Sequence, residues 1–163
     1  AQSMLASSHI YWAATWFGIA ADAFNRAQAF VKQAARKQAE GGLPPGGLRL
    51  AEGAALLQEM KGHLAGAIHR FDAAKGNEDA LSSIGFAAEV NALKVAASAK
   101  AVAVVQLAML ITGILGYKNG TPFSVGRHLR DVASAPIMIS NDRILSNTAT
   151  LMLMSRFDTS LGE

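Results

Sequence analysis

Acidic and imidazole side chains at helical spacing are the residues of this sequence that could bind a metal ion. Glu59 and His63 stand four positions apart, and His69 and Asp72 follow one or two turns later. On one face of a helix such groups come within reach of a single ion. A di-metal site of the ferritin kind would also need two Glu-x-x-His pairs, which the sequence lacks. We therefore interpret these residues as a solvated helix face and predict no metal site.

Serine nucleophiles and phosphate-binding loops find no better support. The serines lie in expected helices or turns, and no Gly-x-Ser-x-Gly elbow is present. The glycine-rich segment in residues 40–47 lacks the lysine and the preceding strand that a P-loop requires. Its prolines and glycines instead predict a connection between two helices.

Apolar residues recurring at three- and four-residue steps predict the helices that must carry any site. One stripe occupies residues 3–37, and a second occupies residues 50–71. The second helix should close at Gly76, where glycine can adopt the left-handed conformation. Asn77 can cap a third helix, which runs to about Leu115 and is apolar on nearly all sides in its second half. We expect this third helix to be the central one.

Glycines and prolines divide the rest of the chain. Gly116 and the breakers that follow it end the third helix, and a short helix is expected over residues 123–133. Pro136 then interrupts the pattern before a final helix over residues 141–156. Four long antiparallel helices with short connections predict an all-α fold, an up-and-down four-helix bundle. Because neither side of the Pro-Gly loop could enclose its own core, residues 1–163 are expected to form one domain.

Composition narrows the class of protein further. Hydrophobic residues make up 51% of the 163, which is enough for a sizeable core. The formal net charge of +3 is interspersed, without the basic runs of a nucleic-acid-binding protein. The longest apolar stretch, residues 101–117, is slightly shorter than the roughly 20 residues of a membrane span and contains Gln106, so we expect a buried helix. Without cysteine there are no disulfides, and a cytoplasmic location is the default.

Two segments carry motifs that can be compared with known families. Residues 4–20 read MLASSHIYWAATWFGIA and continue into an Arg-Lys pair at 36–37. Residues 113–117 (GILGY), 127–131 (RHLRD) and 140–144 (SNDRI) follow in order. Together they resemble the first helix, the glycine turn, the Arg-Asp motif and the last helix start of the acyl-CoA dehydrogenase C-terminal bundle. The resemblance implies an FAD oxidoreductase acting on the CH–CH group of acyl thioesters.

Family members carry an N-terminal helical domain and a β-barrel ahead of this bundle. The sequence contains neither and does not begin with methionine, so we expect a fragment that is inactive by itself. In the family, FAD lies between the barrel and the bundle, and a neighbouring subunit contacts its diphosphate and adenine end. The resemblance therefore implies a homodimer or tetramer, an acyl-CoA substrate and an electron-transfer partner.

The resemblance also assigns residues to the cofactor. Arg36 would bind the FAD diphosphate, because a guanidinium forms charge-assisted bonds to phosphate oxygens. Gly116 would let the backbone approach FAD, and Asn141 and Arg143 would face its adenosine portion. An ordinary helix end, a helix stop and a helix cap explain Arg36, Gly116 and Asn141 equally well. Thr112 stands where many members have a glutamine.

The catalytic base is where the sequence departs from the family. The resemblance implies a glutamate that removes the α-proton of the acyl thioester as hydride passes to flavin N5. Ile139 occupies its usual place, and Ser7, beside Ser8 and His9, occupies the alternative place on the first helix. The candidate bases are Asp142, the nearest acid in sequence, and His9, which can accept a proton at neutral pH. Both also have structural explanations, a helix first turn for Asp142 and packing against tryptophans for His9.

Three explanations of the missing glutamate stay open. The base is relocated, a partner subunit carries the active residues, or the protein is a flavin monooxygenase-like relative with altered chemistry, such as oxygen-dependent hydroxylation. A rival hypothesis from another class is a non-catalytic helical interaction or oligomerisation module, whose exposed apolar faces pack against a partner.

Overall fold

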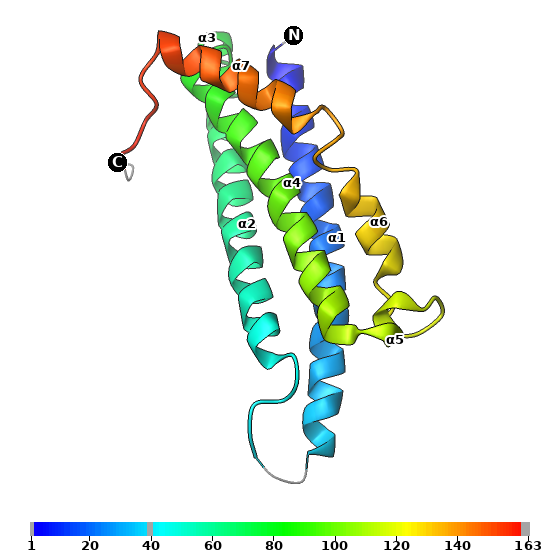
Figure 1. Cartoon of the computed structure of the whole chain (residues 1–163). Coiled ribbons are helices and arrows are strands. Elements are labelled where there is room, and N and C mark those ends of the chain that lie inside the picture. Colours follow the sequence, from blue (N-terminus) through cyan, green and yellow to red (C-terminus); the bar gives the residue numbers. More distant parts are fainter. Residues whose placement is uncertain (1, 39–40, 161–163) are drawn as a thin grey trace.

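Helices form every regular element in the described part of the computed structural model, which covers residues 2–38 and 41–160. Three long helices, α1 (Gln2–Lys37), α2 (Gly47–Ala74) and α4 (Ile84–Thr112), lie side by side, with α2 antiparallel to the other two (Figure 1). The predicted all-α class is confirmed. The glycine- and proline-rich segment predicted to connect two helices does connect α1 to α2 from Gly41 onward, while Glu40 lies outside the described residues.

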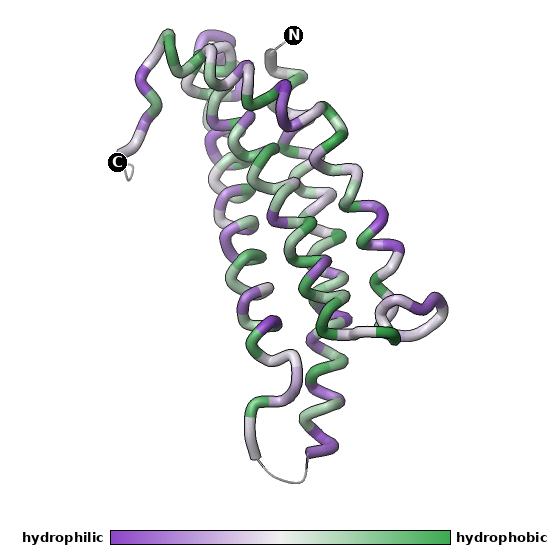
Figure 2. The backbone as a smooth tube through the Cα atoms, in the orientation of Figure 1, coloured by the Kyte–Doolittle hydropathy of each residue, from purple (hydrophilic) through white to green (hydrophobic). Residues whose placement is uncertain are grey.

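The core lies between α1 and α4. Alanines of α1 that are spaced three or four residues apart are almost completely buried, and Trp16 and Val31 extend the same stripe. Small side chains let two helix backbones approach closely, so the apolar atoms pack densely. Hydrophobic residues run along most of α4, whereas hydrophobic and hydrophilic residues alternate along α2 (Figure 2). The prediction that this helix is central is confirmed, since it packs against α1, α2, α6 and α7.

The start of the predicted third helix is the first correction. Asn77 does cap a helix by accepting a hydrogen bond from the backbone of Ala80, but that helix, α3 (Glu78–Leu81), lasts one turn. Ser83 is extended, and its hydroxyl accepts a hydrogen bond from the Phe86 amide to cap α4. A serine cap immediately before an apolar run was the sequence signal for this break.

The other end of that helix differs as well. α4 ends at Thr112, because Gly113 adopts a φ of 55° that side chains rarely accept. The chain then makes the one-turn helix α5 (Ile114–Tyr117), so the expected boundary near Leu115 was three residues too late. The predicted stop of the second helix is confirmed, since Gly76 has a φ of 81°.

The predicted fourth position of the bundle is shared by two shorter helices. α6 (Gly126–Ala133) packs against α1 and α4, and α7 (Asn141–Met154) follows after a bent segment, residues 134–140. α7 runs across the end of the long helices rather than along them (Figure 1). This crossing brings the start of α7 against the first half of α4, where Asn141 contacts Lys94 and Ser98.

α4 is long and apolar enough to cross a membrane by length and composition alone. A packed core helix passes the same test, and α4 packs against α1, α2, α6 and α7 as well as the one-turn helices at its two ends. Membrane insertion therefore has only weak support.

Candidate functional site

A buried lysine, Lys94, lies where α4 meets the segment between α6 and α7. Its Nζ atom donates hydrogen bonds to the carbonyl oxygens of Ala135 at 3.1 Å and Ile139 at 3.3 Å, and to Oδ1 of Asn141 at 2.8 Å. The side chain is fully buried, and burial lowers the pKa of Lys94. These bonds use the three ammonium hydrogens, which is what a buried cation without a carboxylate partner requires.

Asn141 extends this polar network to a serine of α4. Its Nδ2 donates to the hydroxyl of Ser98 at 2.9 Å, and that hydroxyl donates to the carbonyl oxygen of Val95 at 2.8 Å. The cap of α7 is instead Ser140, whose hydroxyl accepts from the Arg143 amide. The capping explanation of Asn141 is therefore wrong, because its side chain points into the bundle.

His9 of α1 is enclosed beside the same lysine. The residue is only 1% exposed, and neither ring nitrogen has a hydrogen-bond partner at acceptable geometry among the described residues. Burial, and then the charge of Lys94, hold the pKa of His9 below its ordinary value, against a smaller opposing effect of the Val90 backbone. Trp16 presents its ring 5.4 Å from the Lys94 ammonium. A neutral imidazole thus lies next to a buried cation.

One place that the resemblance gives to a base, Ile139, therefore lies at Lys94 together with His9, a near neighbour in sequence of the other place, Ser7. The carbonyl oxygen of Ile139 accepts a hydrogen bond from Lys94, and the charge of Lys94 contributes to lowering the pKa of His9 of α1. Asp142 follows in the first turn of α7 and is exposed, without an ion pair to any described residue. The structure thus gathers His9, Ile139 and Asn141 at one end of the bundle, with Asp142 on the adjoining surface.

Arg36 and Gly116 lie apart from this end. At about 1.5 Å per residue, α1 carries Arg36 about 40 Å away from His9, and Arg36 is exposed in the last turn. A Cβ atom on Gly116 would lie 2.8 Å from Cβ of Thr112 and 3.2 Å from Cγ2 of Val125. Packing therefore requires glycine at 116. The Thr112 hydroxyl donates to the carbonyl of its own helix at Ala108, 2.8 Å away.

Two of the four residues considered for a metal ion form ion pairs instead. Glu59 pairs with Lys100 at 2.8 Å, and Asp72 pairs with Lys75 at 2.6 Å. Burial is the main cause that lowers the pKa of His63. No group of three or more possible ligands comes together within the described ranges.

A second polar cluster joins α1 to α6, and sequence reasoning missed it. Oδ2 of Asp22 lies 2.6 Å from Nε2 of His128 and 2.9 Å from Nε of Arg26. Arg26 also donates to the carbonyl oxygen of Ser124 at 3.0 Å. The hydrogen bond from His128 is the main cause that lowers the pKa of Asp22. The cluster borders an open groove of about 510 Å³.

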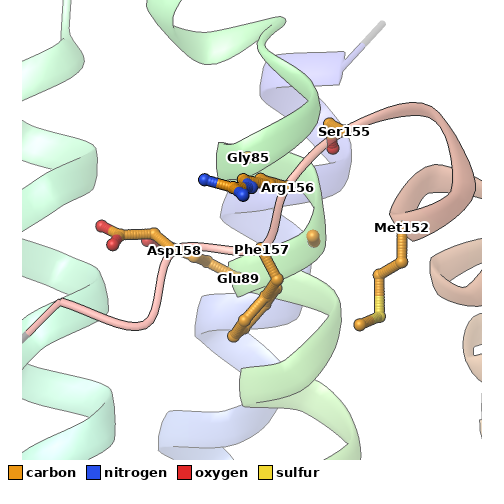
Figure 3. Close-up of a pocket in the computed structure, with 8 residues that line it drawn as sticks. Gly85, Glu89, Met152, Ser155, Arg156, Phe157 and Asp158 are labelled. Carbon is orange, nitrogen blue, oxygen red and sulfur yellow. The ribbon is translucent and has the colours of Figure 1, made fainter.

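The chain beyond α7 turns back along the start of α4 and borders a small cavity of about 60 Å³ (Figure 3). Gly85 and Glu89 of α4 line this cavity together with Met152 and Phe157. None of the predicted site residues contributes to its wall.

Comparison with protein families decides what kind of bundle this is. Residues 1–148 match the model of the acyl-CoA dehydrogenase C-terminal domain. The chain belongs to this family. Neither the curated proteins nor the solved structures give a significant match. The resemblance stated from residues 4–20 and 113–144 is thereby confirmed at the level of the family.

In this acyl-CoA dehydrogenase domain, Lys94 is the central residue that sequence reasoning overlooked. The signal was present, because Lys94 stands between Leu93 and Val95 in a helix predicted to be surrounded by neighbours. A charged residue there must find polar partners when it is buried. What the sequence could not supply was their identity, since two of the three acceptors are backbone carbonyl groups.

Proposed function

We propose that the chain is the C-terminal bundle of an FAD oxidoreductase that acts on the CH–CH group of acyl thioesters, with helical and β-barrel domains ahead of it. Family membership over residues 1–148 supports the proposal. The observation that supports it is that Lys94 bonds to Ile139, one of the positions where the resemblance places the base, and lies beside His9, two residues after the other position, Ser7. We therefore assign the acyl thioester to this end of the bundle.

The exposed arginines suit the anionic part of FAD. Arg36 and Arg143 are exposed and form no ion pair with any described residue, so both can bind phosphate oxygens. Asn141 is held by Lys94 and Ser98 and would keep the start of α7 rigid beside the adenosine portion. Gly116 fits less well, because Thr112 and Val125 fill the space beside it. Bound FAD would accept the hydride that leaves the β-carbon of the substrate.

Asp142 is the better of the two proposed bases. Its carboxylate is exposed and lies in the segment that follows Ile139, so a docked substrate can reach it. His9 is neutral but enclosed, and a substrate could reach its ring only if the surrounding side chains moved. Proton removal requires hydrogen-bond distance between base and substrate, which favours Asp142.

A homodimer or tetramer follows from the placement of Arg36. One chain separates Arg36 from His9 by about 40 Å, so Arg36 would serve the FAD of a neighbouring copy. Leu145, Leu153 and Met154 are exposed on α7 and provide apolar surface for association with the other domains or copies. We place the assembled enzyme in the cytoplasm, with an electron-transfer partner to reoxidise it.

A second candidate function is a flavin monooxygenase-like reaction with oxygen. The observation that favours it is the absence of a carboxylate at both family positions, which hold Ile139 and Ser7. The third possibility is a helical interaction module without flavin.

The test is the visible absorption spectrum of the full-length gene product during anaerobic addition of acyl-CoA thioesters. Dehydrogenation predicts that bound flavin bleaches, and that Asp142→Asn slows bleaching by about 100-fold or more. Asp79→Asn is the matched control, because Asp79 is also an exposed acid in the first turn of a helix. Flavin that stays oxidised with every thioester would favour the oxygen-dependent reaction, and a protein without flavin would favour the interaction module.

Flavin retention separately tests Arg36. Arg36→Met should weaken FAD binding, because it removes a charge assigned to the diphosphate. Lys37→Met is the control, since Lys37 is the exposed cation beside it in the same turn. Equal flavin content in the two variants would contradict the role of Arg36.

A further inference from the structure

Ile139 holds a backbone conformation that its own side chain disfavours. Its φ is 50°, in the left-handed region, where a β-branched residue is strained. The residue is 39% exposed, so it is only partly buried and is not enclosed in the core. Strain of this kind persists only where the surroundings impose it.

The contacts of segment 134–140 show what imposes it. Within the segment, the Met138 amide donates to the Ser134 carbonyl at 2.8 Å, and the Asn141 amide donates to the Pro136 carbonyl at 2.9 Å. These bonds bend the chain but bypass the carbonyl group of Ile139. That carbonyl accepts from Lys94 of α4.

Lys94 bonds to both ends of the bend. It reaches Ala135 near the start, Ile139 near the end, and the Asn141 side chain beyond it. Three acceptors converge on one nitrogen, which suits an ammonium group with its three hydrogens. An apolar side chain of similar length would fill the space but remove the donor to the carbonyl oxygens of Ala135 and Ile139.

We propose that Lys94 is a positioning residue that holds segment 134–140 in its bent form and thereby fixes where residue 139 meets the bundle surface. The inference deepens the proposed function. It rests on that function only in treating position 139 as a place where the family carries its catalytic base. The bend itself is a property of the chain that can be measured without flavin or substrate.

The first experiment measures amide hydrogen exchange in the 163-residue chain. Lys94→Met should speed exchange of the Met138 and Asn141 amides by about tenfold or more, because the bend opens once the ammonium is lost. Lys100→Met is the matched control, since it removes a lysine from the same helix whose partner, Glu59, lies outside the bend. Unchanged protection of segment 134–140 in a folded Lys94→Met variant would overturn the proposal.

The second experiment separates positioning from general packing. Ile139→Ala removes the side chain beyond Cβ and Ile139→Gly removes Cβ as well, so the glycine variant accepts a positive φ much more readily. With Lys94 present, the glycine variant should have a folding equilibrium constant roughly fivefold or more above that of the alanine variant. In the Lys94→Met background this ratio should shrink, because residue 139 is then free to leave the left-handed region. An unchanged ratio would contradict positioning by Lys94.

If Lys94→Met does not fold, a less disruptive substitution can still test the proposal. Asn141→Ala removes the shortest bond of Lys94 while leaving the ammonium in place. Exchange in segment 134–140 should then rise by a smaller factor, and no rise would count against the proposal. Because none of these measurements uses flavin, a protein that binds no FAD would refute the proposed function without affecting this result.

Discussion

The ammonium group of Lys94 lies 2.8 Å from the side-chain oxygen of Asn141, although 47 positions separate the two residues in sequence. This contact joins the central helix to the first turn of α7. It also places a buried lysine beneath Ile139, the position at which the family resemblance would place the base.

Replacing Asn141 should therefore destabilise the fold. Asn141→Ala leaves a buried ammonium with one acceptor fewer, and we expect a loss of about 1–3 kcal/mol in the free energy of unfolding. Urea denaturation measures it. Asn147→Ala, at an exposed position of the same helix, is the control and should cost much less. Similar losses in both variants would mean that the bond to Lys94 contributes little.

Gly116 should not tolerate a side chain. In Gly116→Ala the new methyl group would collide with Thr112 and Val125, and overpacking of this kind costs about 1–3 kcal/mol. Gly62→Ala, in an exposed turn of α2 where no atom lies near the new methyl group, should instead stabilise by roughly 0.5–1 kcal/mol. Thermal unfolding measures both effects: the melting temperature should fall in Gly116→Ala and rise in Gly62→Ala. A neutral Gly116→Ala variant would show that the contact relaxes freely.

Stability should depend on pH through His9. Its pKa in the folded chain lies below the ordinary value of 6.5, so the unfolded chain takes up a proton first as the pH falls. The stabilisation is complete above about pH 6.5 and is lost towards the lower folded-state pKa, by up to about 1.4 kcal/mol per pH unit.

His9→Leu should flatten this dependence in denaturation experiments between pH 7 and pH 5, whereas His69→Leu, at an exposed position, should not. The pKa of His63 is also lowered, so the free energy of unfolding of the His9→Leu variant should still depend on pH, though less steeply. An identical pH profile for wild type and His9→Leu would refute the assignment.

The Asp22 cluster should stabilise the contact between α1 and α6. Asp22→Asn weakens its bonds to His128 and Arg26, and because Asp22 is half exposed we expect a loss of about 1 kcal/mol or less. The pKa of Asp22 is depressed, so this stabilisation is present above its ordinary value of 3.8 and is lost as the pH falls through the folded-state value.

Acid titration of the free energy of unfolding checks this effect. Asp72→Asn is the control, since the pair of Asp72 with Lys75 lies at the end of one helix and joins no second element. If both variants lose acid sensitivity equally, the link between α1 and α6 is not the cause.

The sequence predicted the long helices well because their signals are local. Apolar spacing defined α1, and Gly76 marked the end of α2 through a conformation that glycine accepts readily. The predicted boundaries of α4 were wrong, since Asn77 and Ser83 both qualify as caps and only packing decides which helix continues. The match of residues 1–148 bears out the family stated from short motifs.

The candidate site could be predicted only in part. His9, Ile139 and Asn141 were singled out from their places in the sequence, and the structure brings them together. Lys94, which connects them, was not, because the carbonyl groups of Ala135 and Ile139 carry no sequence signature. The roles of Asp142, Arg36 and Arg143 stay predictions.

The sequence by itself determined the class of this protein, since helical periodicity, caps and family motifs depend on residues close together along the chain. Only the tertiary structure decided that α7 crosses the bundle and that a buried cation lies beneath position 139. Such contacts join residues more than 40 positions apart, and their partners include backbone groups that every residue possesses. Packing therefore selects them, and no local pattern can.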